Sequence, residues 1–352
     1  MVWEPPRLCQ PEYADLGEDQ RLAPILPPGA TLEDWLGMRP SWLRRWQEFL
    51  GQATEPPGQG DAQPINSTVL PWARATEYRQ PTAPGVRQLV VILEPLQPSP
   101  ALRPAALVPF YHPDDMAGWN FTLGKPDRKR LPTQFGRRLV EQGYVVACVE
   151  AFPFNTVPDP KSNEGFAWWK AAAKKLLADN PRWTGMGRLV RDTSRALDLL
   201  LAQPGVDPGR VVAIGHSLGG KMAFYTGCLD DRVKAVIASD FGIGWSFTNW
   251  DAPWYLGPKI HDPGLRLAHH QLLALLAPRP FLLVAGQFDK RESWQYLNAA
   301  RPVYDLYGRG GALACLDHAT GHTPPPQAMR AAYRWLAEQF GLPPAKCCLD
   351  SE

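Results

Sequence analysis

A short glycine-rich turn that joins an apolar strand to a helix constrains this chain more than any other feature. The turn reads Gly215-His216-Ser217-Leu218-Gly219-Gly220, between an apolar strand pattern at 210–214 and a helical pattern from 221 onwards. A turn this tight strains the backbone of the serine and leaves no room for side chains at its flanking glycines. It lifts the serine hydroxyl above the sheet edge, where the Leu218 amide and the helix N-terminus can stabilise a developing oxyanion. We therefore expect Ser217 to be a nucleophile and Leu218 to contribute to an oxyanion hole.

Apolar strands and periodic helices alternate through most of the chain. Strand patterns occupy residues 87–94, 105–111, 144–151, 210–215, 233–239, 281–285 and 312–316. Helical patterns occupy residues 131–142, 187–203, 218–228, 265–276, 293–307 and 327–340. This alternation predicts an α/β fold with a mostly parallel sheet and helices on both faces. No helix separates the first two strands, so we expect them to form a hairpin-like pair and the sheet to start antiparallel.

The chain of 352 residues divides into three predicted parts. Residues 1–70 are a proline-rich N-terminal extension with one amphipathic helix, residues 71–342 form the α/β domain, and residues 343–352 are a C-terminal tail. The domain carries insertions at about 153–185 and 241–263, both rich in aromatic residues. They follow the carboxyl ends of strands, where α/β sheets bind ligands. We expect them to act as lids and Trp245, Trp250 and Trp254 to contact substrate.

A serine nucleophile needs a base and an acid that orients the base. On a fold of this kind the chain order is serine, then acid, then histidine. Asp289 follows the strand at 281–285 and is the predicted acid, although it could instead cap the next helix. Asp240, which ends the preceding strand, is the rival acid. His322, in the loop before the final helix, is the predicted base, and His318 is expected to have a supporting role.

The second oxyanion donor should come from the loop after the strand at 105–111. This loop begins His112-Pro113-Asp114. Because Pro113 has no N–H, Asp114 is the predicted donor. Tyr111 and His112 are expected to line the same corner of the pocket.

Charge, cysteines and termini argue against other classes of protein. The net charge is +2 and no sustained basic face is present, so nucleic acid is not an expected partner. The six cysteines lack the spacing of a zinc site or a disulfide framework, and we expect no metal. Neither a signal peptide nor an apolar run of membrane-spanning length is visible, which predicts a cytoplasmic protein without a membrane partner. The oligomeric state stays open.

The chain resembles α/β-hydrolases of the dienelactone hydrolase and acetyl xylan esterase type over roughly residues 85–340. The resemblance depends on three features. The first is the turn Gly215–Gly220, the nucleophile elbow, with Lys221 after it. The others are Ala277-Pro278-Arg279-Pro280 leading to Asp289, and Gly321-His322 before the last helix. The extended elbow GHSLGGK also looks like that of bacterial glucuronoyl esterase-like proteins. The resemblance implies a triad of Ser217, Asp289 and His322, no cofactor, and ester substrates that include carbohydrate-linked ones. The chain departs from the pattern at His112-Pro113, where His-Gly is usual, and at Ser217, where dienelactone hydrolases proper have cysteine.

Together these observations predict a serine hydrolase that cleaves carboxylic esters, carbohydrate-linked or bulky, through an acyl-enzyme. Two alternatives stay open. A prolyl-oligopeptidase-like peptidase shares the catalytic domain but carries a large N-terminal propeller, for which the residues before the first clear strand are too few. A non-catalytic binding protein of this fold would be expected to have lost the serine or the histidine.

Overall fold

The computed structural model describes residues 22–51, 61–83, 85–127, 131–157 and 166–343, which form parts of two compact units. The elbow unit comprises the chain up to residue 46, residues 212–249 and the chain from residue 266 on. The strand-rich unit comprises residues 47–211 and 250–265. Strand β8 (Val206–His216) begins in the strand-rich unit and ends in the elbow unit. None of the described helices is both long and apolar enough to cross a membrane.

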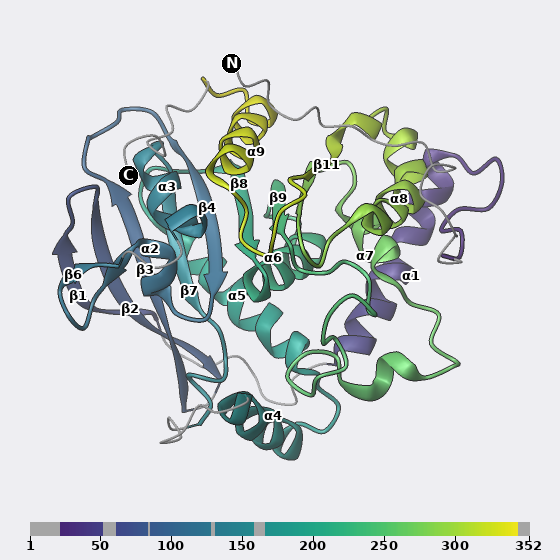
Figure 1. The fold of residues 1–352 in the computed structure, drawn as a ribbon, viewed down its shortest axis with the longest axis horizontal. Helices are drawn as coiled ribbons and strands as arrows, with labels where there is room; N and C mark the ends of the chain where they lie inside the picture. Colours follow the sequence, from purple (N-terminus) through teal and green to yellow (C-terminus); the bar gives the residue numbers. More distant parts are fainter. Residues whose placement is uncertain (1–21, 52–60, 84, 128–130, 158–165, 344–352) are drawn as a thin grey trace. The chain divides into compact units, whose positions relative to one another are not determined.

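Five strands of the main sheet lie wholly in the described part of the strand-rich unit, in the order β1-β2-β3-β7-β4 (Figure 1). They are β1 (Gln63–Val69), β2 (Ala73–Ala83), β3 (Val86–Pro95), β7 (Val145–Glu150) and β4 (Arg103–Phe110). Neighbouring strands from β1 to β7 pair antiparallel, and β7 pairs parallel with β4. The predicted antiparallel start is therefore confirmed.

The predicted hairpin between the strands at 87–94 and 105–111 is wrong. These strands are β3 and β4, and β7 lies between them, paired with β3 through Val90–Leu93 and with β4 through Ala105–Phe110. The sequence reading also missed β1 and β2. Most side chains of β1 are exposed, as suits a strand at a sheet edge, so β1 lacks the apolar pattern that marks a buried strand.

The helices of the strand-rich unit match the sequence expectation in part. Helix α3 (Phe135–Glu141) and helix α5 (Gly185–Leu201) lie within or close to two predicted helices and pack against the strands. Thr184 caps α5, because its hydroxyl accepts a hydrogen bond from the amide of Gly187 at 3.0 Å. The short helix α2 (Pro113–Ala117) and the helix α4 (Ala167–Asp179), which lies inside the first insertion, were not predicted.

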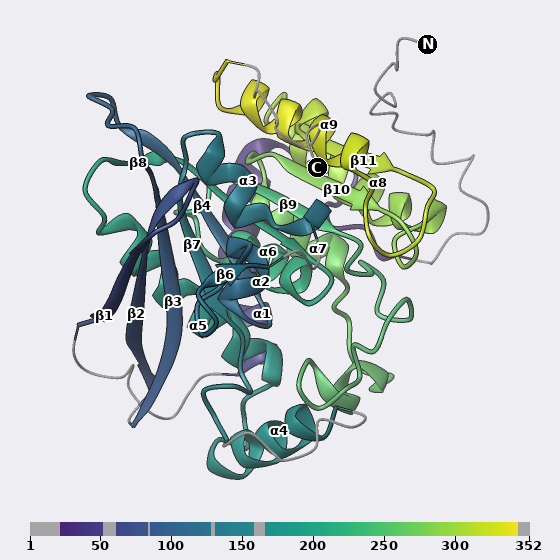
Figure 2. The same ribbon diagram turned by 60° about the vertical axis from the view of Figure 1, so that its left-hand side comes forward.

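The elbow unit contains the end of β8 followed by β9 (Ala235–Ser239), β10 (Phe281–Ala285) and β11 (Leu313–Asp317), all parallel. Each of the four predicted helices is present, and α9 packs against β9 and β10 (Figure 2). They are α6 (Leu218–Leu229), α7 (His269–Leu276), α8 (Trp294–Leu306) and α9 (Pro326–Gln339). Parallel strands with helices between them bring the carboxyl ends of the strands to one edge. Ser217 and Asp240 directly follow β8 and β9 at this edge.

Helix α1 (Leu32–Leu50) confirms the predicted amphipathic helix of the N-terminal extension. Thr31 and Asp34 cap its start by exchanging hydrogen bonds between each side chain and the other's amide. β1 lies in the same predicted extension, so residues 63–69 belong to the sheet. The tail from residue 344 on, together with residues 1–21, lies outside the described part of the chain.

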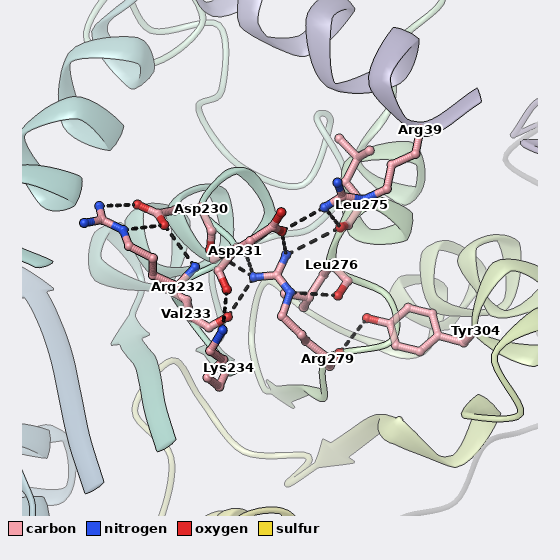
Figure 3. Close-up of polar contacts among 11 residues, drawn as sticks. Arg39, Asp230, Asp231, Arg232, Val233, Lys234, Leu275, Leu276, Arg279 and Tyr304 are labelled. Carbon is pink, nitrogen blue, oxygen red and sulfur yellow. Dashed lines mark hydrogen bonds and ion pairs between the residues drawn. The ribbon is translucent and has the colours of Figure 1, made fainter. Parts of the chain in front are cut away.

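Arg279 fastens the loop after α6 to the end of α7 (Figure 3). Its Nη1 donates to the carbonyl oxygens of Gly227, Asp230 and Val233 at 2.7–2.9 Å. The last carbonyls of a helix have no partner within the helix, so this guanidinium satisfies groups that α6 leaves open. Arg279 Nη2 and Arg39 Nη2 both pair with Asp231, at 3.0 and 2.8 Å, which links α1 to the same loop.

We predict that Arg279→Met lowers the free energy of unfolding by about 3 kcal/mol, because it leaves several carbonyls without a donor. Urea denaturation would measure the loss. Arg232→Met is the matched control, since Arg232 pairs with Asp230 at the surface and its removal should cost less than about 1 kcal/mol. Equal losses in the two variants would contradict this role of Arg279.

A buried histidine ties α6 and α7 to the loop that follows β9. His269 Nε2 accepts a hydrogen bond from Trp245 Nε1 at 3.0 Å and lies 2.6 Å from the Tyr225 hydroxyl. His269 Nδ1 lies 2.5 Å from the carbonyl oxygen of Ile243, and the Trp46 ring of α1 stacks on the imidazole with centroids 6.1 Å apart. Burial lowers the pKa of His269 to about 3. The imidazole is therefore neutral at ordinary pH, with its proton on Nδ1.

This forced neutrality predicts a pH dependence of stability. Below the ordinary pKa near 6.5 the unfolded chain binds a proton at His269 that the folded chain does not bind. Stability is therefore lost as the pH falls. Between pH 7.5 and 5, the free energy of unfolding of the wild type should fall about 2 kcal/mol more than that of His269→Gln. His261→Gln, which changes an exposed histidine, should keep the wild-type pH dependence. Parallel pH profiles for wild type and His269→Gln would contradict the prediction.

Candidate active site

The turn after β8 has the strained geometry that its sequence predicts. Ser217 has φ 55° and ψ −116°, outside the ordinary regions for a residue with a side chain. A Cβ atom on Gly215 would lie 2.1 Å from the backbone carbon of Gly219, so only glycine fits there. The Ser217 amide donates to the carbonyl oxygen of Ser239 at 2.8 Å, which fastens the turn to the end of β9. Strain of this kind is maintained only where the surrounding structure fixes it.

The N-terminus of α6 directly follows the serine. The first backbone hydrogen bond of this turn runs from the Lys221 amide to the Ser217 carbonyl at 3.0 Å. Across the described ranges, no group accepts a hydrogen bond from the Leu218 amide. This amide and the helix dipole can therefore act on negative charge that develops next to Ser217.

His322 lies beside this turn and is held by Asp240. His322 Nδ1 lies 2.6 Å from Asp240 Oδ2, and its imidazole ring is 4.4 Å from that of His216, the residue before the serine. His216 is itself buried, with Nδ1 3.1 Å from the hydroxyl of Ser239. The Phe288 ring packs edge-on against His322 at 5.0 Å. The imidazole thus has one face and one nitrogen fixed by the protein.

Asp240 has a geometry suited to a carboxylate that orients a histidine. It follows β9 directly, with a positive φ of 41°, and its side chain is buried. Its Oδ1 accepts the amides of Phe288 and Asp289, both at 2.8 Å. Burial raises the pKa of Asp240, but the hydrogen bonds from His322 and the two amides outweigh this and keep the pKa below its ordinary value. Asp240 is therefore ionised next to the imidazole at neutral pH.

The structure corrects the prediction that Asp289 is the partner of His322. Both oxygens of Asp289 are used elsewhere: they accept the amides of Gly242 and Ile243 at 2.8 and 2.7 Å, and the Ser293 hydroxyl at 2.9 Å. Burial raises the pKa of Asp289 to about 6, against the lowering effect of these hydrogen bonds. Asp289 is thus a completely buried brace between the loops that leave β9 and β10.

Two further side chains of the elbow unit support these loops. Lys221 is buried and donates to the Thr248 hydroxyl at 2.5 Å, which agrees with a structural role. His318 begins the loop that leads to His322, and its Nδ1 lies 2.6 Å from the Thr320 hydroxyl. A Cβ on Gly286 would lie 2.6 Å from the His318 ring, so this glycine makes room for the histidine loop.

The predicted second oxyanion donor belongs to the strand-rich unit. Asp114 lies in the first turn of α2, after Pro113, where helix amides have no intrahelical acceptor. Its carboxylate accepts the Phe121 amide at 3.2 Å, and burial raises its pKa to about 6. Leu218 and Asp114 lie in different units, so their joint action on one oxyanion stays a prediction.

The predicted substrate-contacting aromatic residues of the strand-rich unit pack against aromatic side chains of the first insertion. Tyr111 meets Trp169 edge-on at 5.7 Å, and His112 lies 4.0 Å from the Phe154 ring. Trp254 is nearly buried and stacks on Phe166 with ring centroids 5.4 Å apart. The two aromatic insertions therefore contact each other within this unit.

Two of the predicted tryptophans need a different interpretation. Trp250 is completely buried and has no free face for a ligand, so the prediction that it contacts substrate is wrong. Trp245 is only partly buried, but its indole N–H points to His269. The sequence analysis missed His269 as a support of this loop, because a histidine in an apolar helix has no distinctive pattern.

In the elbow unit, the serine turn, Asp240 and His322 lie at the carboxyl ends of three parallel strands of one sheet. Ser217 follows β8, Asp240 follows β9, and His322 lies in the loop after β11. No cluster of three or more histidine, cysteine or acidic side chains that could hold a metal ion occurs within the described ranges.

Sequence comparisons find a matching family and several relatives of this chain. Residues 129–246 match the dienelactone hydrolase family. The chain is 26% identical over 216 residues to YtaP of Bacillus subtilis, which is named as a hydrolase. The match covers 68% of the length of YtaP. The chain is 24% identical over 198 residues to the carbohydrate esterase MZ0003 of an unknown prokaryotic organism, of which it covers 45%. These matches extend over 57% and 49% of this chain.

Solved structures show the same fold at low sequence identity. A glucuronoyl esterase from Solibacter usitatus is 17% identical with a TM-score of 0.66, covering 89% of this chain and 95% of that one. A Bacteroides fragilis structure described as an acetyl xylan esterase is also 17% identical, with a TM-score of 0.67 over 87% of this chain and 80% of that one. The chain therefore has the α/β-hydrolase fold, and its residues 129–246 match the dienelactone hydrolase family.

Proposed function

We propose that the protein is a serine hydrolase of carboxylic esters, with Ser217 as nucleophile, His322 as base and Asp240 as the acid that orients the base. The observation that carries this proposal is the 2.6 Å contact between His322 Nδ1 and Asp240 Oδ2 beside the strained serine turn. A histidine held in this way is a recurring part of serine hydrolases, whatever the order of the three residues in the chain.

The hydrogen-bond partners of His322 determine which of its nitrogens can take part in the proposed reaction. Because Nδ1 of His322 faces Asp240, Nε2 is the nitrogen that can take the Ser217 proton as the serine oxygen attacks the ester carbonyl. Asp240 then stabilises the imidazolium. The Leu218 amide would stabilise the oxyanion. The imidazolium returns the proton to the leaving alcohol, and water activated by His322 then releases the acid from Ser217.

The names of several relatives favour esters carried on carbohydrates as the substrate class. The sequence relative MZ0003 is a carbohydrate esterase, and the structural neighbours include glucuronoyl esterases. The neighbours share the fold at identities near 17%, so the acyl and alcohol groups are to be determined by assay. A panel of p-nitrophenyl esters, methyl glucuronate and acetylated xylan covers the main options.

We predict that Ser217→Ala abolishes fluorophosphonate labelling and lowers kcat/KM for p-nitrophenyl acetate by about 10⁴-fold or more. His322→Gln should have an effect of similar size, because the two residues act as a unit. The experiment compares these variants with a wild type shown to be folded by circular dichroism. A folded wild type that neither turns over any ester of the panel nor reacts with the fluorophosphonate would overturn the proposal.

Substitutions of Asp240 and Asp289 should have different effects, which distinguishes the two candidate acids. Asp240→Asn should lower kcat by about 10³- to 10⁴-fold with little loss of thermal stability, because asparagine keeps the oxygen that accepts the two amides but loses the charge that faces the imidazole. Asp289→Asn should instead lower the melting temperature, since each of its oxygens accepts a different buried amide and asparagine keeps only one oxygen, and should lower kcat by less than about 10²-fold. If Asp289→Asn were the more damaging to kcat and Asp240→Asn nearly harmless, the assignment of the acid would be wrong.

A further inference from the structure

A hollow of about 480 Å³ opens between the loops that leave β9 and β10. Six residues line it, two from the first loop and four from the second: Ser246, Phe247, Gln287, Phe288, Lys290 and Glu292. Its volume lies in the range of sites for small ligands. Nothing in the mechanism above uses this hollow.

The hollow starts next to the proposed base. The Phe288 ring, which forms part of its wall, packs against His322 at 5.0 Å. A ligand in the hollow would therefore lie one side chain away from the imidazole. Carboxyl ends of neighbouring parallel strands are also the place where ligands bind in sheets of this kind.

The two loops are locked to each other, so the hollow exists before any ligand arrives. Asp240, at the start of the first loop, accepts the amides of Phe288 and Asp289 in the second. Asp289 in turn accepts the amides of Gly242 and Ile243 in the first loop. Phe247 is held from behind by the Tyr296 ring of α8 at 6.0 Å. A preformed site loses less entropy when it binds.

The polar side chains of the hollow are not used by the protein itself. Ser246, Gln287, Lys290 and Glu292 have no side-chain hydrogen bond or ion pair with any residue in the described part of the chain. They offer an ammonium, an amide, a hydroxyl and a carboxylate, which together include several donors and several acceptors. Two phenylalanine rings add apolar faces beside them.

Polar side chains of both charges next to two phenylalanine rings favour one class of ligand. Lys290 would disfavour a cation and Glu292 an anion. A purely apolar acyl chain would cover polar groups without giving them partners. A sugar ring fits both needs, because its hydroxyls donate and accept, whereas its C–H face packs on an aromatic ring. Relying on the proposed esterase function, we infer that the hollow is a subsite for an uncharged sugar unit, joined to the part of the substrate that carries the ester.

Binding can be tested without turnover. Ser217→Ala protein is titrated with xylotriose and cellotriose, and with hexanoate and trigalacturonate as apolar and anionic probes, while ¹H–¹⁵N spectra are recorded. We expect saturable binding of at least one neutral trisaccharide and no saturation by the other two probes. Adding Gln287→Ala or Phe247→Ala should weaken that binding about fivefold each, the size of one hydrogen bond or one ring contact. Gln97→Ala, which changes an exposed glutamine between β3 and β4, should leave it unchanged.

Kinetics give a second readout. Gln287→Ala should reduce kcat/KM for acetylated xylotriose about fivefold more than for p-nitrophenyl acetate, mainly through KM. Failure of both neutral trisaccharides to bind, or equal weakening by Gln287→Ala and Gln97→Ala, would overturn the subsite. Failure of the esterase proposal has a different signature: the wild type would hydrolyse no ester, even if a trisaccharide still bound in the hollow.

Discussion

The position of His322 depends on an interlock, a reciprocal set of hydrogen bonds between the loops that follow β9 and β10. Asp240 ends β9 and accepts two amides of the loop after β10, whereas Asp289 lies in that second loop and accepts two amides of the first. Each carboxylate is buried and fully hydrogen-bonded, which is the condition under which buried charge is tolerated. The same interlock leaves one oxygen of Asp240 free to face His322, and so it sets the position of the imidazole.

The interlock continues into the body of the elbow unit. His269 holds the Ile243 carbonyl and the Trp245 indole, so the loop after β9 is anchored to α7 as well. Trp46 of α1 stacks on His269, which gives the N-terminal helix a part in supporting this loop. At the amino-terminal ends of β9 and β10, Arg279 gives the fold a second fastening point. The loops that carry Asp240 and Asp289 are thus held by side chains outside the proposed triad.

The serine turn and the parallel strands could be predicted from the sequence because local pattern alone determines them. A glycine is required where a Cβ would lie 2.1 Å from another backbone atom, and buried parallel strands are continuous apolar runs. The choice between Asp240 and Asp289 could not be made in this way. Both follow buried strands, and only the three-dimensional hydrogen bonds separate them. The exposed edge strand β1 and the buried Trp250 were misjudged for the same reason, since burial is a property of the whole fold.

The contact between His322 and Asp240 is tested most directly by ¹H NMR of ¹⁵N-histidine-labelled protein, in which the proton on His322 Nδ1 can be observed. A proton held between an imidazole and a buried carboxylate resonates far downfield. The structure predicts that this resonance is present in the wild type and in Asp289→Asn but lost in Asp240→Asn and in His322→Gln. Loss of the signal in Asp289→Asn with retention in Asp240→Asn would contradict the assignment and return the acid to the loop after β10.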